Sequence, residues 1–187
     1  MNREWAKKRV AWAKRNRFRL GAAIAALAAI AIVIVVASGG DDSKTPANGA
    51  EIVSVNELRE KVALQGTPAY WAGERPDTEL ELSQSGGGRT YVRYLTDGAE
   101  AGDPRPAFLT VGTYETADPV AVLRNQGRQP GGVLAKAPGG GTVYFRRTDA
   151  HSVYLAYPGV AVQIEVYDPD FKRALRLVNA GQIVPVG

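Results

Sequence analysis

The chain has 187 residues, of which 45% are hydrophobic and 22% are charged, with one histidine and no cysteine. This length fits one globular domain with an additional segment. The lack of cysteine excludes disulfides, cysteine-ligated zinc, iron–sulfur clusters and a thiolate nucleophile.

The positive charge of the chain is concentrated at its N-terminus. The formal net charge is +4, but residues 1–19 contain eight Lys and Arg against one acidic residue, a balance of +7. All later residues together contain 15 basic and 18 acidic side chains, a balance of −3. Because the basic character belongs to a short tail, the charge pattern does not indicate a nucleic-acid-binding protein.

An uncharged apolar run follows this basic tail and covers residues 20–37. As a helix with a rise of about 1.5 Å per residue, the run would span about 27 Å, close to the thickness of the hydrocarbon core of a bilayer. Cations before the run and Asp41 and Asp42 after it favour a cytoplasmic N-terminus. We therefore predict that residues 20–37 form one transmembrane helix, a signal anchor in the cell membrane, with the following residues outside the cytoplasm.

The same region allows a cleaved signal peptide, since residues 35–37 provide small side chains at a possible cleavage position. In that case the domain would be secreted. The run is longer than the apolar core of a typical signal peptide, which favours the uncleaved anchor. Trp5 and Trp12 lie among the cations of residues 1–19, so we expect this cytoplasmic tail to contact anionic lipid headgroups.

The composition changes again after the apolar run. Residues 38–50 are rich in Ser, Gly and Asp without apolar periodicity, which predicts a flexible linker. Residues 51–187 are numerous enough to bury a core without disulfides or metals. They are predicted to form one extracytoplasmic domain.

Capping residues and terminating glycines predict about three short helices in this domain. The first follows Ser54, has Glu57 as its capping-box partner and ends at Gly66. The other two are each introduced by an Asp-Pro pair, in which Asp caps the helix and Pro takes the first helical position. Their pairs and terminating glycines are Asp118-Pro119 with Gly127 and Asp168-Pro169 with Gly181.

Between these helices, apolar and polar residues alternate with a period of two, which predicts strands. The predicted strands are residues 79–83, 90–95, 107–114, 142–147, 152–157 and 160–167. Short connections with glycine triplets at residues 86–88 and 139–141, and a Pro158-Gly159 turn, indicate antiparallel neighbours. The predicted fold class is α+β: a mostly antiparallel sheet with about three short helices, preceded by one N-terminal transmembrane helix.

No pattern in the domain predicts a catalytic, cofactor or metal site. The glycine triplets lack the spacing of a phosphate-binding loop, and hairpin turns explain them. Asp149 and His151 would share one face of a strand while Ser152 points to the other, which opposes a catalytic arrangement. Glu165, Asp168 and Asp170 are too irregularly spaced for a calcium loop, and the two aspartates are explained by the start of a helix.

Strand alternation predicts one candidate surface for a partner. If Val92 and Val143 point inward, their neighbours in sequence point outward and form a face rich in Tyr, Arg and Glu. Such a face can stack on sugar rings or peptide aromatics and pair with carboxylates. The alternative is that these side chains are ordinary cross-strand pairs that stabilise the sheet and are covered by one of the helices. The candidate residues are Tyr91, Arg93, Tyr144, Arg146, Tyr154, Glu165 and Tyr167.

Two classes of function follow from these observations. The absence of a catalytic motif favours a membrane-anchored binding or scaffolding module of the cell envelope, with an envelope protein or a glycan as its partner and no nucleic acid. The alternative is an exported, hydrolase-like enzyme whose site is not visible in one sequence.

Overall fold

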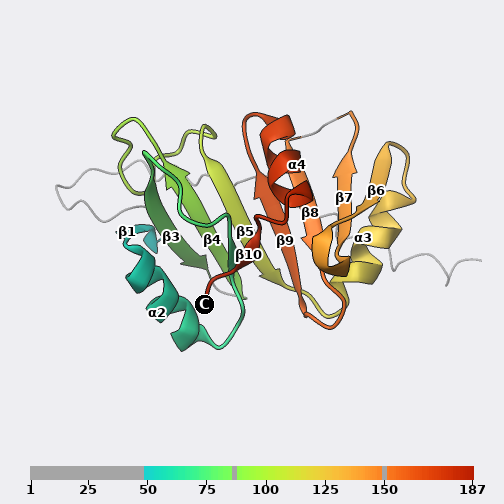
Figure 1. Ribbon diagram of the computed structural model, residues 1–187, viewed down its shortest axis with the longest axis horizontal. Helices are drawn as coiled ribbons and strands as arrows, with labels where there is room; N and C mark the ends of the chain where they lie inside the picture. Colours follow the sequence, from blue (N-terminus) through green and yellow to red (C-terminus); the bar gives the residue numbers. More distant parts are fainter. Residues whose placement is uncertain (1–48, 86–87, 149–150) are drawn as a thin grey trace, which may run out of the picture. The chain divides into compact units, whose positions relative to one another are not determined.

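The computed structural model describes residues 49–85, 88–148 and 151–187 (Figure 1). The predicted tail, the transmembrane helix at residues 20–37 and nearly all of the linker lie outside these described residues. Within the described ranges, no helix combines the length and apolar character needed to cross a membrane.

The described domain is built on an eight-stranded antiparallel sheet (Figure 1). Its strands are β1 (Glu51–Val53), β3 (Glu79–Ser85), β4 (Arg89–Leu95), β5 (Leu109–Glu115), β6 (Gly132–Lys136), β7 (Thr142–Arg146), β8 (Ser152–Ala156) and β9 (Val162–Tyr167). They are ordered β1-β3-β4-β5-β9-β8-β7-β6. Two antiparallel meanders, β3 to β5 and β6 to β9, therefore meet where β5 pairs with β9. A separate two-stranded ribbon joins β2 (Tyr70–Trp71) and β10 (Val184–Pro185).

Three α-helices accompany the sheet within the described residues, so the predicted α+β class with a mostly antiparallel sheet is confirmed. They are α2 (Val55–Gln65), α3 (Pro119–Gly127) and α4 (Phe171–Asn179), and a short 3-10 turn, η2 (Pro138–Gly140), joins β6 to β7. The predicted capping box of α2 is present: the Glu57 N–H donates to Ser54 Oγ at 3.3 Å and the Ser54 N–H to Glu57 Oε2 at 2.7 Å. Asp118 caps α3 by accepting the Ala121 N–H at 3.0 Å.

The predicted start of α4 is wrong by two residues. The N-cap is Asp170, which accepts the Lys172 N–H at 3.0 Å. Asp168 is fully buried, accepts the Asp170 N–H at 2.7 Å and pairs with Arg173. The carboxylate of Asp168 is used by the Asp170 N–H and by Arg173 in the turn that precedes the helix, and the next aspartate along the chain provides the cap.

All six predicted strands are present, with shifts of a few residues at their ends. The strands β1, β2, β6 and β10 were not predicted. Three of them have only two or three residues, and β6 has no regular alternation between buried and exposed positions. Their pairing depends on neighbours that are distant in sequence, so local periodicity carries no signal for them.

The main core lies on one face of the sheet, which we call the helix face. In Figure 1, α2 crosses this face near β1 and β3, and α4 crosses it near β8 and β9. Leu58 of α2 and Ala174 of α4 are fully buried there, and Phe171 contacts Phe145 with ring centroids 5.3 Å apart. Val92, Val111, Val153 and Ile164 supply the sheet side of this core.

Candidate binding face

The strand register places all seven candidate residues on the face of the sheet opposite the helix face. We call it the tyrosine face. Tyr91 is opposite Gly112, Gly112 is opposite Glu165, Glu165 is opposite Tyr154, and Tyr154 is opposite Tyr144. Arg93, Arg146 and Tyr167 are two residues along their strands from members of this row, so they share the same face.

One end of the tyrosine face is covered by α3. Tyr144 is only 6% exposed and packs in a small cluster with Leu123 and Ala156. Its ring lies 5.9 Å from that of Tyr154, which is half-buried against the same cluster. Tyr144 is therefore not part of an open face: α3 packs over it, as in the alternative in which a helix covers these side chains.

The other end is covered by the segment between β4 and β5. Glu81 is 1% exposed, and its carboxylate accepts from Arg93 Nη1 at 2.8 Å and from the Gly102 N–H at 2.7 Å. Arg93 also donates to the Asp103 carbonyl at 2.8 Å and lies over the ring of Phe108. Since both terminal nitrogens of its guanidinium donate within the chain, Arg93 fastens this segment to the sheet.

At the centre, three hydroxyl groups converge on the carboxylate of Glu165. Tyr114 Oη donates to Oε2 at 2.6 Å, and Ser152 Oγ and Tyr154 Oη donate to Oε1 at 2.6 and 3.2 Å. Burial raises the pKa of Tyr114 far above its usual value, and the charge of Glu165 raises it further. Burial and Glu165 raise the pKa of Tyr154 in the same way. Both phenols remain donors at neutral pH.

Gly112 creates the space that this arrangement needs. A Cβ atom there would lie 2.7 Å from Tyr114 Oη, so the ring of Tyr114 leans across Gly112 to reach Glu165. Tyr91 packs edge-on against Tyr114, with ring centroids 5.7 Å apart and an interplanar angle of 82°. Aromatic rings favour this geometry over a face-to-face stack.

Tyr114, Ser152 and Gly112 were missed as site residues by the sequence reasoning. Alternation along the predicted strand 107–114 would have placed Tyr114 and Gly112 on one face with Thr110. Nothing local connects Tyr114 with Glu165, however, because 51 positions separate them and their strands meet only in the assembled sheet.

The uncovered centre of the tyrosine face presents three half-buried side chains, Tyr91, Glu165 and Tyr167. Tyr167 Oη donates to the Pro106 carbonyl at 2.7 Å, which holds its ring in place. A carboxylate offers about four acceptor positions, and three of those of Glu165 are occupied by hydroxyls of the chain. By this count, Oε2 has one acceptor position without a hydrogen-bond partner among the described residues. We call these three residues the central strip.

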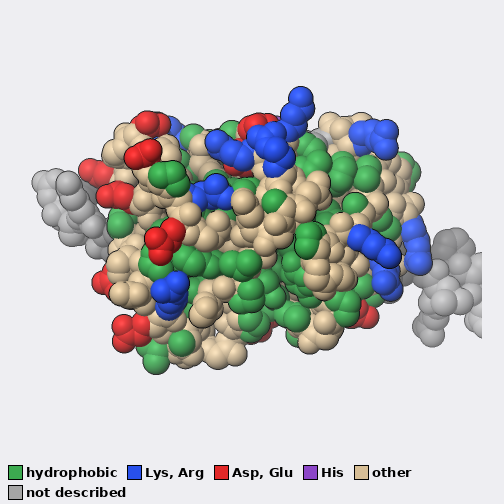
Figure 2. Space-filling model, in the orientation of Figure 1, with side chains coloured by type: hydrophobic (Ala, Val, Ile, Leu, Met, Phe, Trp, Pro, Cys, Tyr) green, Lys and Arg blue, Asp and Glu red, His purple; other side chains and the backbone are tan. Residues whose placement is uncertain are grey.

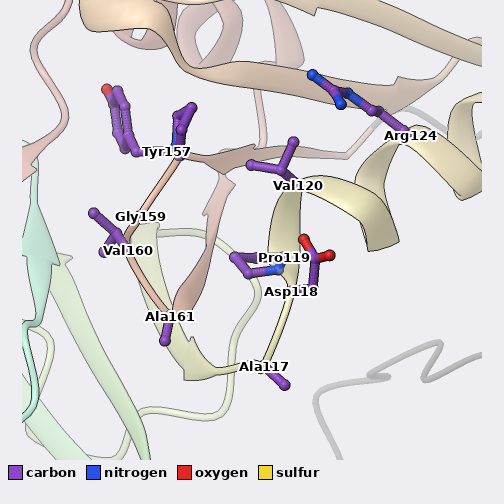
Figure 3. A pocket seen from close by; sticks show the side chains of 10 residues that line it. Ala117, Asp118, Pro119, Val120, Arg124, Tyr157, Gly159, Val160 and Ala161 are labelled. Carbon is purple, nitrogen blue, oxygen red and sulfur yellow. The ribbon is translucent and has the colours of Figure 1, made fainter.

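A separate hollow of about 420 Å³ lies between the start of α3 and the turn from β8 to β9. In Figure 3, Pro119 and Val120 face Val160 and Ala161 across it. A second hollow of about 380 Å³ adjoins it through Ala117 and Ala161. The walls of the first hollow are both apolar and polar, since Arg124 and the carboxylate of Asp118, which accepts the Ala121 N–H, also line it.

The described residues contain no group of three or more His, Asp or Glu that could hold a metal ion. His151 is exposed, and Ser152 donates to Glu165. Asp149 lies outside the described residues. Arg146, the remaining candidate residue, is exposed beyond the end of the central strip, beside β6.

Comparisons of the chain with protein-family models, with curated proteins and with solved structures found no match.

Proposed function

We propose that this protein is a single-pass, membrane-anchored binding module of the cell envelope, whose domain lies outside the cytoplasm and contacts its partner through the central strip. The observation that carries the binding proposal is the acceptor position on Glu165 Oε2 that no described residue fills, on a face that also presents the half-buried rings of Tyr91 and Tyr167. These groups belong to β4 and β9, which both pair with β5 in the antiparallel sheet, so a ligand meets a surface that is already ordered. Preorganisation of this kind reduces the entropic cost of binding.

The chemistry of the strip favours a glycan over a peptide as the ligand. Tyrosine rings contact the C–H surface of a sugar ring, and Glu165 already accepts hydrogen bonds from hydroxyl groups. A sugar hydroxyl can occupy the remaining acceptor position. An envelope protein is the alternative partner that the binding experiment distinguishes.

The anchoring part of the proposal rests on the +7 tail followed by the uncharged residues 20–37. Alkaline phosphatase fused after Gly187 should be active in intact cells, and a reporter that works only in the cytoplasm should be inactive there. The opposite result would reverse the orientation. A mature N-terminus near Ser38 would show that the segment is cleaved.

The binding part is tested with the full chain in detergent and purified cell-wall glycan as the probe. Tyr91→Ser should reduce co-sedimentation with the glycan, because the substitution removes one wall of the strip. Tyr157→Ser is the matched control. Like Tyr91, Tyr157 is half-buried and contacts one buried tyrosine, in this case Tyr70, with ring centroids 6.2 Å apart. Equal binding by both variants would contradict the proposed site, and binding to an envelope protein alone would exclude the glycan.

A further inference from the structure

Charge is segregated along the sheet. Residues 119–148, which include α3, β6 and β7, contain five Lys and Arg and no acidic residue. Residues 51–118, which include α2 and the strands from β1 to β5, contain 12 acidic and 6 basic residues. In Figure 2 most of the visible Asp and Glu lie at the β1 and β3 side, whereas Lys and Arg are visible over α4 and at the α3 and β6 side as well as near α2.

The five cations of the basic segment are all exposed. They are Arg124, Arg128, Lys136, Arg146 and Arg147. In the part of the chain that the structure describes, none of them forms an ion pair, although ion pairs occur elsewhere in the domain. A group of like charges without counter-charges produces a positive potential that attracts an anionic partner.

The same segment contains one edge of the sheet, because β6 is last in the strand order and, among the described residues, pairs with β7 alone. The Ala137 N–H donates to the Gly141 carbonyl and the Arg147 N–H to the Gly131 carbonyl, each at 2.9 Å. In an antiparallel pair, alternate residues point their N–H and C=O groups toward the partner strand. The backbone groups of Leu134 and Lys136 are therefore directed away from β7.

The side chains of β6 differ between the two faces of this edge. Leu134 and Lys136 share the tyrosine face with Arg146, and Leu134, 43% exposed, packs beside Gly127 of α3. Val133 and Ala135 lie on the helix face and remain partly or fully exposed. A strand added here would meet cations on one of its faces and apolar side chains on the other.

We propose that β6 is a docking edge for an extended acidic segment of a partner protein, which adds to the sheet as a further strand. Its carboxylates lie on the tyrosine-face side, near Lys136 and Arg146, and its apolar residues continue the row of Val133 and Ala135. The partner segment therefore alternates acidic and apolar residues. Backbone hydrogen bonds supply affinity in strand addition, and the alternating side chains supply specificity.

A second copy of the chain is a poor occupant of this edge. Pairing β6 with β6 of another copy would bring two sets of five exposed cations together without acidic residues from the same segment to offset them. Like charges across paired strands are destabilising. The edge is also separate from the central strip, so the present proposal does not depend on the proposed function.

The test uses the full chain in detergent and a seven-residue peptide that alternates Glu and Val, with a Lys and Val peptide as the control probe. Hydrogen exchange followed by mass spectrometry should show that only the acidic peptide slows exchange within residues 132–136. Slowed exchange with both peptides, or at another strand in place of β6, would overturn the proposal.

A pair of variants at Leu134 separates the contribution of the backbone N–H to peptide binding from that of the side chain. Leu134→Ala and Leu134→Pro both remove the leucine side chain, but only proline removes the outward N–H while leaving the bonds from Val133 and Ala135 to β7. We expect Leu134→Pro to bind the acidic peptide about fivefold to tenfold more weakly than Leu134→Ala, the loss of one hydrogen bond. Equal affinities would mean that the cations attract any polyanion, which would overturn strand addition.

A second set of variants keeps the test decisive if Leu134→Pro does not fold. Arg146→Gln with Arg147→Gln should weaken peptide binding several-fold, and raised salt should reduce the difference from the unmodified chain. Lys172→Gln is the control, because it removes an exposed cation on α4, outside the basic segment. The same loss for Lys172→Gln as for the arginine pair would show a general charge effect and overturn the proposed location.

Discussion

Tyr114 Oη lies 2.6 Å from Glu165 Oε2, across the line where β5 and β9 pair. This contact joins the two meanders of the sheet on the tyrosine face, opposite the main core. The same carboxylate accepts the hydroxyl of Ser152 from β8, so one side chain connects three strands. Glu165 therefore has a structural role in addition to its place in the central strip, and the two roles can be separated by experiment.

Glu165→Ala should reduce the free energy of unfolding by about 2–4 kcal/mol, because the buried hydroxyl of Tyr114 and the hydroxyls of Ser152 and Tyr154 lose their common acceptor. Urea unfolding followed by near-ultraviolet circular dichroism measures the change. Glu165→Gln keeps one acceptor oxygen and should lose less. An unchanged midpoint for Glu165→Ala would show that water replaces the carboxylate without cost.

Gly112→Ala should destabilise the domain by about 1–3 kcal/mol, since the new Cβ would lie 2.7 Å from Tyr114 Oη and force that ring to move. The effect should be coupled to the hydroxyl group of Tyr114. In a double-mutant cycle with Tyr114→Phe, the alanine substitution should therefore cost less than it does alone. Full additivity in the measured unfolding free energies would contradict the contact between these two positions.

Asp168→Ala should destabilise the domain more than Asp170→Ala. Asp168 is fully buried and holds both the Asp170 N–H and Arg173, so its loss leaves a donor without a partner at a cost of about 2–3 kcal/mol. Asp170 is a surface N-cap worth about 1 kcal/mol. Thermal unfolding of the two variants gives the order, and the reverse order would contradict the stabilising role of the buried Asp168 carboxylate.

Alkaline pH should unfold the domain. Burial raises the pKa of Tyr94 to about 12, and it also raises the pKa values of Tyr114 and Tyr154 above the usual value of about 10. A group whose pKa is higher in the folded state than in the unfolded state stabilises the fold, and this contribution is complete below the unfolded-state pKa. This stabilisation is lost as pH rises through the folded pKa, so unfolding should begin between about pH 10 and 12.

The absorbance of ionised tyrosine at alkaline pH measures this titration. Tyr94, Tyr114 and Tyr154 should ionise together with the loss of circular dichroism, whereas in concentrated urea they should ionise near pH 10. Tyr94→Phe removes one late-titrating group. A smooth titration of every tyrosine near pH 10 in the folded chain would contradict the burial of these hydroxyls.

The sequence by itself determined the elements whose cause is local. Ser54 with Glu57 and Asp118 with Pro119 mark helix starts through contacts within one turn, and alternation along residues 162–167 sets which side chains face the core. For the same reason alternation placed Tyr91, Glu165 and Tyr167 on one face correctly, because the period of a strand is a property of its own backbone.

Only the tertiary structure decided which of those side chains remain accessible. Tyr144 lies beneath α3 and Arg93 is held by Glu81 and the segment before β5, and both contacts join residues that local periodicity does not relate. The edge position of β6 likewise depends on the order of the strands in the sheet. Contacts between distant parts of the chain determine which side chains are covered, which strands pair and which strand lies at an edge. Helix caps and strand alternation, by contrast, arise within a few residues.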